Sequence, residues 1–140
     1  MSAVAAPPPV AYRADVTGHG RGVRRLGRSF GYAGRGLGVA WAGGNYRVQV
    51  AAAAAVAFVA AAYGVTGAQL GLVVLSIAAV ISAEIVNTAV ERLCDLVGEL
   101  HGLGRDPRIR DIKDLAAGAV LVTSLGATGV GLVVFVPLIH

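Results

Sequence analysis

The chain has 140 residues, of which 56% are hydrophobic and only 14% are charged. Soluble globular domains average about 25% charged residues, so this composition excludes an ordinary soluble domain and favours one small integral membrane domain. A single cysteine, Cys94, excludes an intrachain disulfide and a four-cysteine zinc site. The net charge of +4 is uneven, because residues 1–47 carry seven basic side chains and one acidic side chain. This basic segment precedes the first apolar run, which favours contact with lipid headgroups over contact with nucleic acid.

The N-terminal region divides into two segments of different composition. Residues 1–23 are rich in proline and glycine and show no apolar period, which predicts a disordered basic tail. Residues 24–43 mix arginines with aromatic and aliphatic side chains, as an amphipathic helix at a membrane surface does. Each glycine in this helix costs about 1 kcal/mol relative to alanine.

Three apolar runs follow, and they predict three transmembrane helices. The 36 residues between Arg47 and Glu84 carry no charge, whereas one span needs about 20 residues. Turn-forming residues at 63–69 divide this run into a first span at about 48–63 and a second at about 70–96. Residues 115–140 are again without charge and predict a third span at about 115–138. The expected fold class is therefore an all-α integral membrane domain over residues 24–140, with three spans and an N-terminal surface helix.

The basic residues near the ends of the spans predict the orientation. Arginines before the first span, and three more between residues 97 and 112, place both segments in the cytoplasm. The uncharged turn at 63–69 is easily translocated. Three spans then place the C-terminus outside, so we expect a multi-pass protein of the cell inner or plasma membrane with a cytoplasmic N-terminus.

The second span carries acidic side chains at helical spacing. At about 100° per residue, Glu84, Asn87, Glu91 and Asp95 fall within an arc of about 80°. Charge in hydrocarbon is costly, so such a stripe is expected to face the protein interior or a wet cavity. These oxygen donors suit Mg²⁺, and a buried carboxylate can serve as a general base for a lipid hydroxyl. The alternatives are a solvated helix end and a small proton or cation carrier.

A second cluster, RDPRIRDIKD at 105–114, comes just before the third span. Its cations can hold phosphate, and its aspartates can hold a metal or position the lysine. The alternative is a cytoplasmic loop of charges that reach the headgroup layer. Lys113 and Asp114 lie at the mouth of the third span, where a helical hairpin would bring them toward the acidic stripe.

Two segments together resemble a known family. EIVNTAVERLCD at 84–95 fits the pattern E-x-x-N-[ST]-A-x-E-x-x-x-D, and KDLAAGAVL at 113–121 fits K-D-x-x-[AS]-[AG]-A-V. With three spans at these positions, the chain resembles the prokaryotic diacylglycerol kinase and undecaprenol kinase family over residues 24–140.

The resemblance implies a small homotrimeric membrane kinase that phosphorylates a membrane lipid alcohol with ATP and Mg²⁺. It implies Glu84 as the base, Glu91 as a ligand of the metal and of the nucleotide, and Asn87 and Asp95 as substrate-binding residues. Further residues fit the family's nucleotide and lipid-headgroup positions. These are Arg25, Tyr32, Glu99, His101, Lys113 and Asp114 for ATP, and Trp41 and Arg47 for the lipid.

One position departs from the family pattern. The family usually has a second metal-binding glutamate before the first span, where this chain has Gly43 or Gly44. Asn45 or a backbone carbonyl can substitute, a weaker metal site can suffice, or the chain is a degenerate, non-catalytic trimer of the same fold. The sequence does not choose between undecaprenol and diacylglycerol, which differ mainly in their apolar parts.

Overall fold

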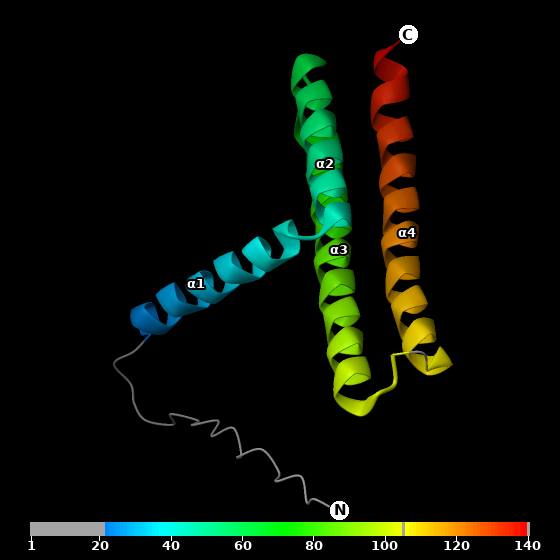
Figure 1. Cartoon of the computed structure of the whole chain (residues 1–140). Helices are drawn as coiled ribbons and strands as arrows, with labels where there is room; N and C mark the ends of the chain where they lie inside the picture. Colours follow the sequence, from blue (N-terminus) through cyan, green and yellow to red (C-terminus); the bar gives the residue numbers. More distant parts are fainter. Residues whose placement is uncertain (1–21, 105, 140) are drawn as a thin grey trace, which may run out of the picture. The chain divides into compact units, whose positions relative to one another are not determined.

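Four α-helices make up the chain in the computed structural model, which describes residues 22–104 and 106–139, with side chains from residue 27 onward. They are α1 (Gly22–Trp41), α2 (Gly44–Ala62), α3 (Gly67–His101) and α4 (Pro107–Phe135), followed by a short 3₁₀ helix at Val136–Leu138 (Figure 1). The chain divides into two units, Met1–Ala33 and Gly34–His140. All described elements are helical, as the sequence predicts. Residues 1–21 of the predicted tail at 1–23 lie outside the described residues.

Three of these helices are long and apolar enough to cross a membrane. They are Gly44–Ala62, Gly67–His101 and the continuous stretch Pro107–Leu138. Their large apolar side chains are mostly exposed in the chain alone: Phe58 is 74% exposed and Leu115 is 76% exposed. Exposed apolar surface of this extent suits contact with lipid or with other helices in a membrane. The protein is therefore a multi-pass membrane protein, and the shorter α1 precedes its spans.

The helix breaks occur where local chemistry requires them. α2 ends before Tyr63, and Gly64 follows with a φ of 65°, a conformation that glycine adopts without steric cost. This break falls within the segment 63–69, for which a turn is expected. At the other end of α3, Gly102 has a φ of 66° and its amide bonds to the Gly98 carbonyl, which ends the helix.

The connection between α3 and α4 is shorter than the sequence suggested. A loop was expected from about 97 to 112, whereas the helices leave only residues 102–106 between them. α3 continues to its glycine cap, and Asp106 caps the start of α4 directly before Pro107. The helices thus extend beyond the apolar runs, and the expected spans at 48–63, 70–96 and 115–138 cover only part of their lengths.

Asp106 makes the start of α4 sensitive to acid. The Arg108 guanidinium donates to its carboxylate at 2.8 Å and the Arg108 amide at 2.9 Å, and these bonds lower the pKa of Asp106 from 3.8 to about 2. Because folding lowers this pKa, the stabilisation is complete above about pH 4 and is lost as the pH falls toward 2. We expect Asp106→Ala to unfold a few degrees below the wild type at pH 7, with the difference shrinking between pH 4 and pH 2. Circular dichroism melting curves in detergent test this, and a difference that does not change with pH would contradict it.

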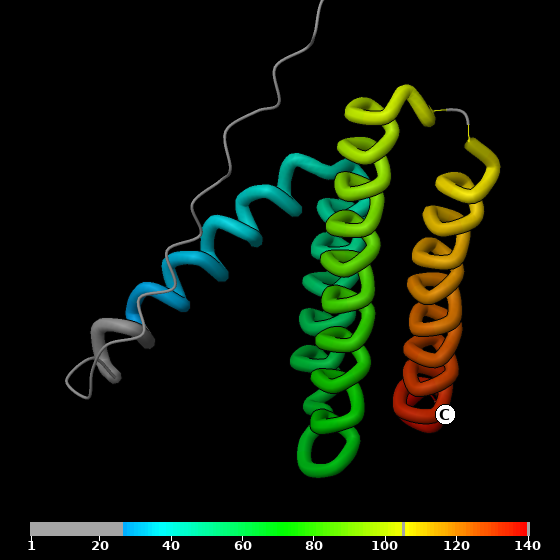
Figure 2. The backbone as a smooth tube through the Cα atoms, turned by 90° about the horizontal axis from the view of Figure 1, so that it is seen from below, coloured from blue at the N-terminus to red at the C-terminus, as the bar shows by residue number. Residues whose placement is uncertain are grey.

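α3 is the central helix of the second unit. It packs against both α2 and α4, whereas no described Cα of α2 comes within 8 Å of a Cα of α4 (Figure 2). The buried apolar side chains gather near the α2–α3 turn, where Ala60, Val65, Val73 and Val134 form one cluster. Away from this cluster, side chains that project from α2, α3 and α4 line the space between α2 and α4.

Candidate functional site

A cavity of about 360 Å³ lies among α2, α3 and α4. Each helix contributes one face to it, because the lining residues recur at spacings of three and four. α2 contributes Asn45, Val48 and Gln49, and α3 contributes Glu84, Asn87 and Glu91. The α4 residues are Ala117, Val120, Leu121 and Ser124. The acidic face predicted for the second span is therefore directed into a cavity, as expected.

Two polar side chains of this cavity are almost completely buried. Glu84 and Asn87 are each 3% exposed, and no lysine or arginine is among the lining residues. A carboxylate in such a place lacks the cation that usually compensates a buried charge. The cavity is thus suited to a ligand that brings a positive charge or a hydrogen-bond donor.

The hydrogen bonds of Asn87 support the same conclusion. Its side-chain amide donates to Glu91 Oε1 at 3.0 Å, which orients the two groups one turn apart on α3. Within the described part of the chain, Asn87 Oδ1 and Ser124 Oγ are buried without a hydrogen-bond partner. An unpaired buried polar atom costs about 1–3 kcal/mol, so these atoms favour a bound polar group or ion.

Asp95 lies outside this cavity although it belongs to the same predicted stripe. Its carboxylate accepts a hydrogen bond from Lys113 Nζ at 2.5 Å, an ion pair between α3 and α4. The rise of a helix places Asp95 about 16 Å from Glu84 along α3, which is beyond the end of the cavity. The α3–α4 hairpin therefore brings Lys113 next to Asp95 of the acidic stripe, as expected, and Asp95 lies one helical turn from Glu91.

A tight corner joins α1 to α2 next to the site. Arg92, the residue after Glu91, donates to the Val39 carbonyl of α1 at 3.2 Å, and the Gly43 amide donates to the Ala40 carbonyl at 2.9 Å. A Cβ on Gly43 would lie 3.2 Å from that same carbonyl oxygen. Gly43 and Gly44 are the two positions where the family resemblance places a glutamate. A side chain at Gly43 would need a small shift of its neighbour, whereas a Cβ on Gly44 would meet nothing within 4 Å. Asn45 is the first side chain of α2 that lines the cavity.

The remaining candidate residues lie elsewhere. Asp114 pairs with Arg110 at 3.7 Å on the exposed side of α4. His101 Nδ1 lies 3.2 Å from the Val97 carbonyl oxygen, near the exposed Glu99 at the end of α3. Trp41 is 54% exposed, with its ring edge-on to Tyr46 at 6.2 Å between centroids. Arg47 and Tyr32 are exposed, and Arg25 is a residue of α1 whose side chain lies outside those described.

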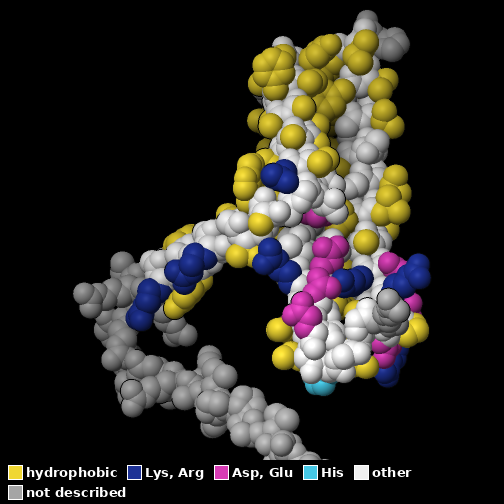
Figure 3. Space-filling view, viewed as in Figure 1, with side chains coloured by type: hydrophobic (Ala, Val, Ile, Leu, Met, Phe, Trp, Pro, Cys, Tyr) yellow, Lys and Arg dark blue, Asp and Glu magenta, His cyan; other side chains and the backbone are white. Residues whose placement is uncertain are grey.

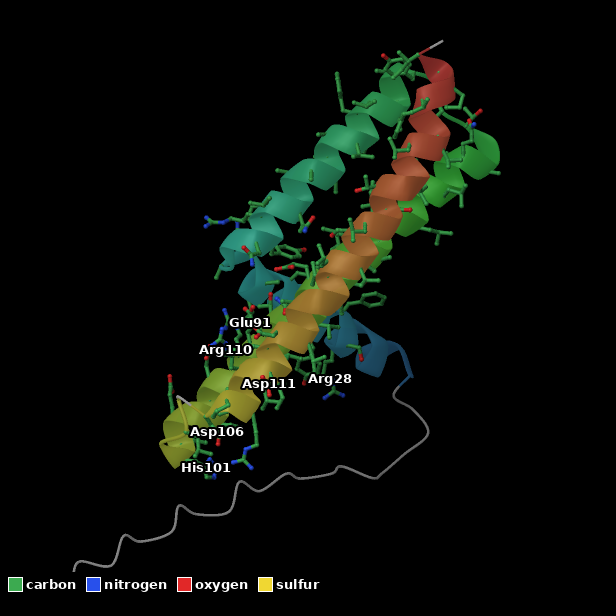
Figure 4. All side chains as sticks on the ribbon, turned by 90° about the vertical axis from the view of Figure 1, so that its right-hand side faces the viewer. Arg28, Glu91, His101, Asp106, Arg110 and Asp111 are labelled. Atoms are coloured by element: carbon green, nitrogen blue, oxygen red, sulfur yellow. The ribbon has the colours of Figure 1, made fainter. Side chains whose placement is uncertain are left out.

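Charged side chains gather over the end where α3 turns into α4. Figure 3 shows acidic and basic groups there, and an apolar surface over the end where α2 turns into α3. In Figure 4, His101 and Asp106 lie at the α3–α4 connection, Arg110 and Asp111 follow on α4, and Glu91 lies further along α3. Glu91, which lines the cavity, thus lies further from the α3–α4 connection than His101 and Asp106 do.

Sequence reasoning missed two polar lining residues, Gln49 and Ser124. Gln49 is the only polar side chain between Val48 and Ala62, and an isolated polar residue within a span is a signal of function. Ser124 has hydroxyl-bearing neighbours at 123 and 128, so its sequence position alone does not distinguish it.

These same two residues also line a second, larger cavity. It has a volume of about 500 Å³ and extends between the helices toward Phe135 and Ile139. Its other lining residues are almost all apolar, including Val56, Ile77 and Leu132. A polar cavity with two carboxylates is therefore adjacent to an apolar cavity, with Gln49 and Ser124 at their boundary. Such an arrangement fits a molecule with one polar and one apolar end.

Comparison with known proteins finds one family and one relative that this sequence resembles. The family described as Prokaryotic diacylglycerol kinase matches residues 31–135. Undecaprenol kinase of Bacillus subtilis (strain 168) is 32% identical over 124 residues, which cover 88% of this chain and 98% of that protein. No solved structure gives a significant match.

Proposed function

The chain belongs to the prokaryotic diacylglycerol kinase family, a family of membrane lipid kinases, and from this premise we propose that it transfers the γ-phosphoryl group of ATP to the hydroxyl of undecaprenol or diacylglycerol. Members of the family phosphorylate lipid alcohols, and a kinase of this kind uses ATP. The observation that carries the proposal is the buried carboxylate of Glu84 in a polar cavity adjacent to an apolar one.

Glu84 is the proposed general base. Its carboxylate takes the proton of the lipid hydroxyl while the hydroxyl oxygen attacks the γ-phosphorus in line with the leaving oxygen. The bond between the γ-phosphorus and the bridging oxygen breaks, and ADP leaves with that oxygen. Asn87 and Asp95 are proposed to bind the lipid substrate on the same helix, and Trp41 and Arg47 to contact its headgroup region.

Glu91 is the proposed ligand of Mg²⁺. The donors around it fit this ion, because the cavity offers carboxylate and amide oxygens, and one of the latter, Asn87 Oδ1, is buried and unpaired. When bound, Mg²⁺ neutralises charge on the transferring phosphate. Asn87 orients Glu91 through the 3.0 Å hydrogen bond between them.

Cations and polar groups near the α3–α4 hairpin are proposed to hold the nucleotide. Lys113 is the central candidate, because its ammonium group pairs with Asp95, which lies one helical turn from Glu91 on α3. The proposed ATP-binding residues are Arg25, Tyr32, Glu91, Glu99, His101, Lys113 and Asp114. Phosphoryl transfer depends mainly on positioning and on neutralising charge, which such a set can provide.

We place the charged end of the helices at the cytoplasmic face. α3 rises about 1.5 Å per residue, so Glu84 lies about 26 Å from the start of this helix at Gly67. With Gly67 at the outer edge of a hydrocarbon core of about 30 Å, Glu84 lies just inside the inner edge, within reach of a lipid hydroxyl. The N-terminus is then cytoplasmic and the C-terminus outside. We further propose that residues 24–140 act as one domain and assemble as a homotrimer, with no nucleic acid partner.

A second candidate function is a non-catalytic membrane protein of the same fold. The glycines at 43 and 44, where the family resemblance places a metal-binding glutamate, favour this alternative. It predicts that the protein binds nucleotide weakly and without dependence on Mg²⁺.

A phosphorylation assay distinguishes the two candidates. Purified protein in detergent micelles receives γ-labelled ATP, MgCl₂ and either undecaprenol or diacylglycerol. We expect label in at least one extracted lipid, with EDTA abolishing the transfer. If protein that is folded and normally solubilised in detergent labels neither lipid, the kinase proposal is refuted.

A further inference from the structure

The wall of the polar cavity formed by α2 carries amide groups in place of carboxylates. Asn45 and Gln49 lie one helical turn apart and both line the cavity opposite Glu84 and Glu91. Among the described residues, no three histidine, cysteine, aspartate or glutamate side chains gather closely enough to hold a metal. A cation in this cavity must therefore take part of its coordination from neutral oxygens.

An independent observation favours a positively charged or hydrogen-bond-donating group in this cavity. Asn87 is 3% exposed, lines the cavity, and its Oδ1 accepts no hydrogen bond within the described chain. Its amide nitrogen is already committed to Glu91. The free acceptor, two carboxylates and two further amides surround one volume of about 360 Å³ that no lysine or arginine lines.

Among its described residues, α2 contributes amides and no carboxylate to the cavity. Gly43 and Gly44 before Asn45 bear no side chain. A Cβ at Gly43 would lie 3.2 Å from the Ala40 carbonyl oxygen, and a Cβ at Gly44 would meet nothing within 4 Å. α2 starts at Gly44, so Asn45 is its first residue with a side chain, and that side chain lines the cavity.

We propose that Asn45 and Gln49 supply neutral oxygen donors to a divalent-cation site whose charged donor is Glu91. The role of the cation in catalysis rests on the proposed kinase function. Binding of the cation does not, since it can be measured without nucleotide or lipid. Amide and carboxylate oxygens both bind Mg²⁺ and Mn²⁺, but cation affinity rises with the number of carboxylates. The protein alone therefore binds the cation weakly, and nucleotide phosphates complete the site.

The same logic gives a gain-of-affinity test. Asn45→Asp adds a carboxylate to the α2 wall and is expected to lower the Kd for Mn²⁺ at least about tenfold. Gln49→Glu is expected to act in the same direction. Asn45→Ala and Gln49→Ala remove an oxygen donor and are expected to raise the Kd. A misfolded variant loses the cavity and is expected to bind Mn²⁺ less tightly, so a gain of affinity in the two acidic variants is the result that distinguishes the donors from a folding defect.

The probe is Mn²⁺ alone, and its binding to the full-length protein in detergent micelles is measured by electron paramagnetic resonance. Gln69→Glu is the matched control, because it adds the same charge to an exposed position in the first turn of α3, outside the cavity. We expect this control to bind Mn²⁺ as the wild type does. If Asn45→Asp and Gln69→Glu give the same Kd as the wild type, the proposed amide donors are wrong.

The outcome of this test is separable from that of the proposed function. If the wild type phosphorylates lipid while the acidic variants leave Mn²⁺ binding unchanged, the kinase assignment stands and the inference fails. If the acidic variants tighten Mn²⁺ binding while the wild type phosphorylates no lipid, the cation site stands and the kinase assignment fails.

Discussion

Glu84→Gln is expected to lower lipid phosphorylation by about 10²–10⁴-fold, the contribution typical of a general base. Glutamine has nearly the same shape as glutamate but cannot take a proton from the lipid hydroxyl. Glu84 is 3% exposed and lines the polar cavity, so the substitution also removes a buried charge without leaving an empty space. The fold is therefore expected to persist, and the loss should appear in kcat.

The measurement compares initial rates at saturating MgATP and lipid, with protein matched by its elution profile in detergent. Asp111→Asn is the control, because it removes one acidic charge from an exposed position on α4 that does not line the cavity. This control is expected to retain wild-type activity. A Glu84→Gln variant with wild-type kcat would exclude Glu84 as the base, whatever the lipid.

Removing the carboxylate also separates the base from the cation site. Glu84→Gln retains Glu91, Asn45 and Gln49, so binding of Mn²⁺ should weaken far less than kcat falls. If Mn²⁺ binding and kcat decline together, Glu84 is a cation ligand and not a base. The two readouts thus assign the roles of the two carboxylates independently.

The sequence predicted the helices well because membrane spans depend on simple physical requirements. Hydrocarbon excludes charge, so the charge-free runs around 48–83 and 115–140 had to become helices, which satisfy their own backbone hydrogen bonds. The ends of the helices depend instead on local caps. Gly102 ends α3 and Asp106 caps the start of α4, so both helices reach well into the segment expected to be a loop.

The site was predictable only where it follows from one helix. The 100° rotation per residue placed Glu84, Asn87 and Glu91 on one face, and that face lines the cavity. The rotation alone also places Asp95 on this face. The rise along the helix axis, however, puts Asp95 beyond the cavity, where it pairs with Lys113. Gln49 and Ser124 could not be found in this way, because their positions depend on the register between different helices.

Lys113→Met is expected to lower kcat by about 10²–10³-fold and to raise the KM for MgATP, since a positioned cation stabilises charge that develops on the transferring phosphate. Lys113 is the only lysine of the chain, and its ammonium group is held 2.5 Å from Asp95. Lys113→Arg keeps the charge but replaces a compact ammonium with a planar fork, so it should retain part of the activity.

The single lysine allows a direct test of contact with the nucleotide. An amine-reactive reagent can modify Lys113 and the N-terminal amine, and peptide mapping distinguishes the two. We expect MgATP to protect Lys113 and to leave the N-terminal amine reactive. Protection at neither position would show that Lys113 does not bind phosphate.

Asp95 is the ion-pair partner of Lys113, the proposed nucleotide contact. The ion pair is largely exposed, with Asp95 61% and Lys113 34% accessible, so its own contribution to stability is small and phosphate can replace the carboxylate as partner. If Asp95 only holds the lysine ready, Asp95→Asn should change activity much less than Lys113→Met, and the double variant should resemble Lys113→Met alone. Asp95→Asn could instead abolish activity while MgATP still protects Lys113. The contact with the nucleotide would then be intact, so the loss would lie in binding of the lipid, and Asp95 itself would take part in that binding.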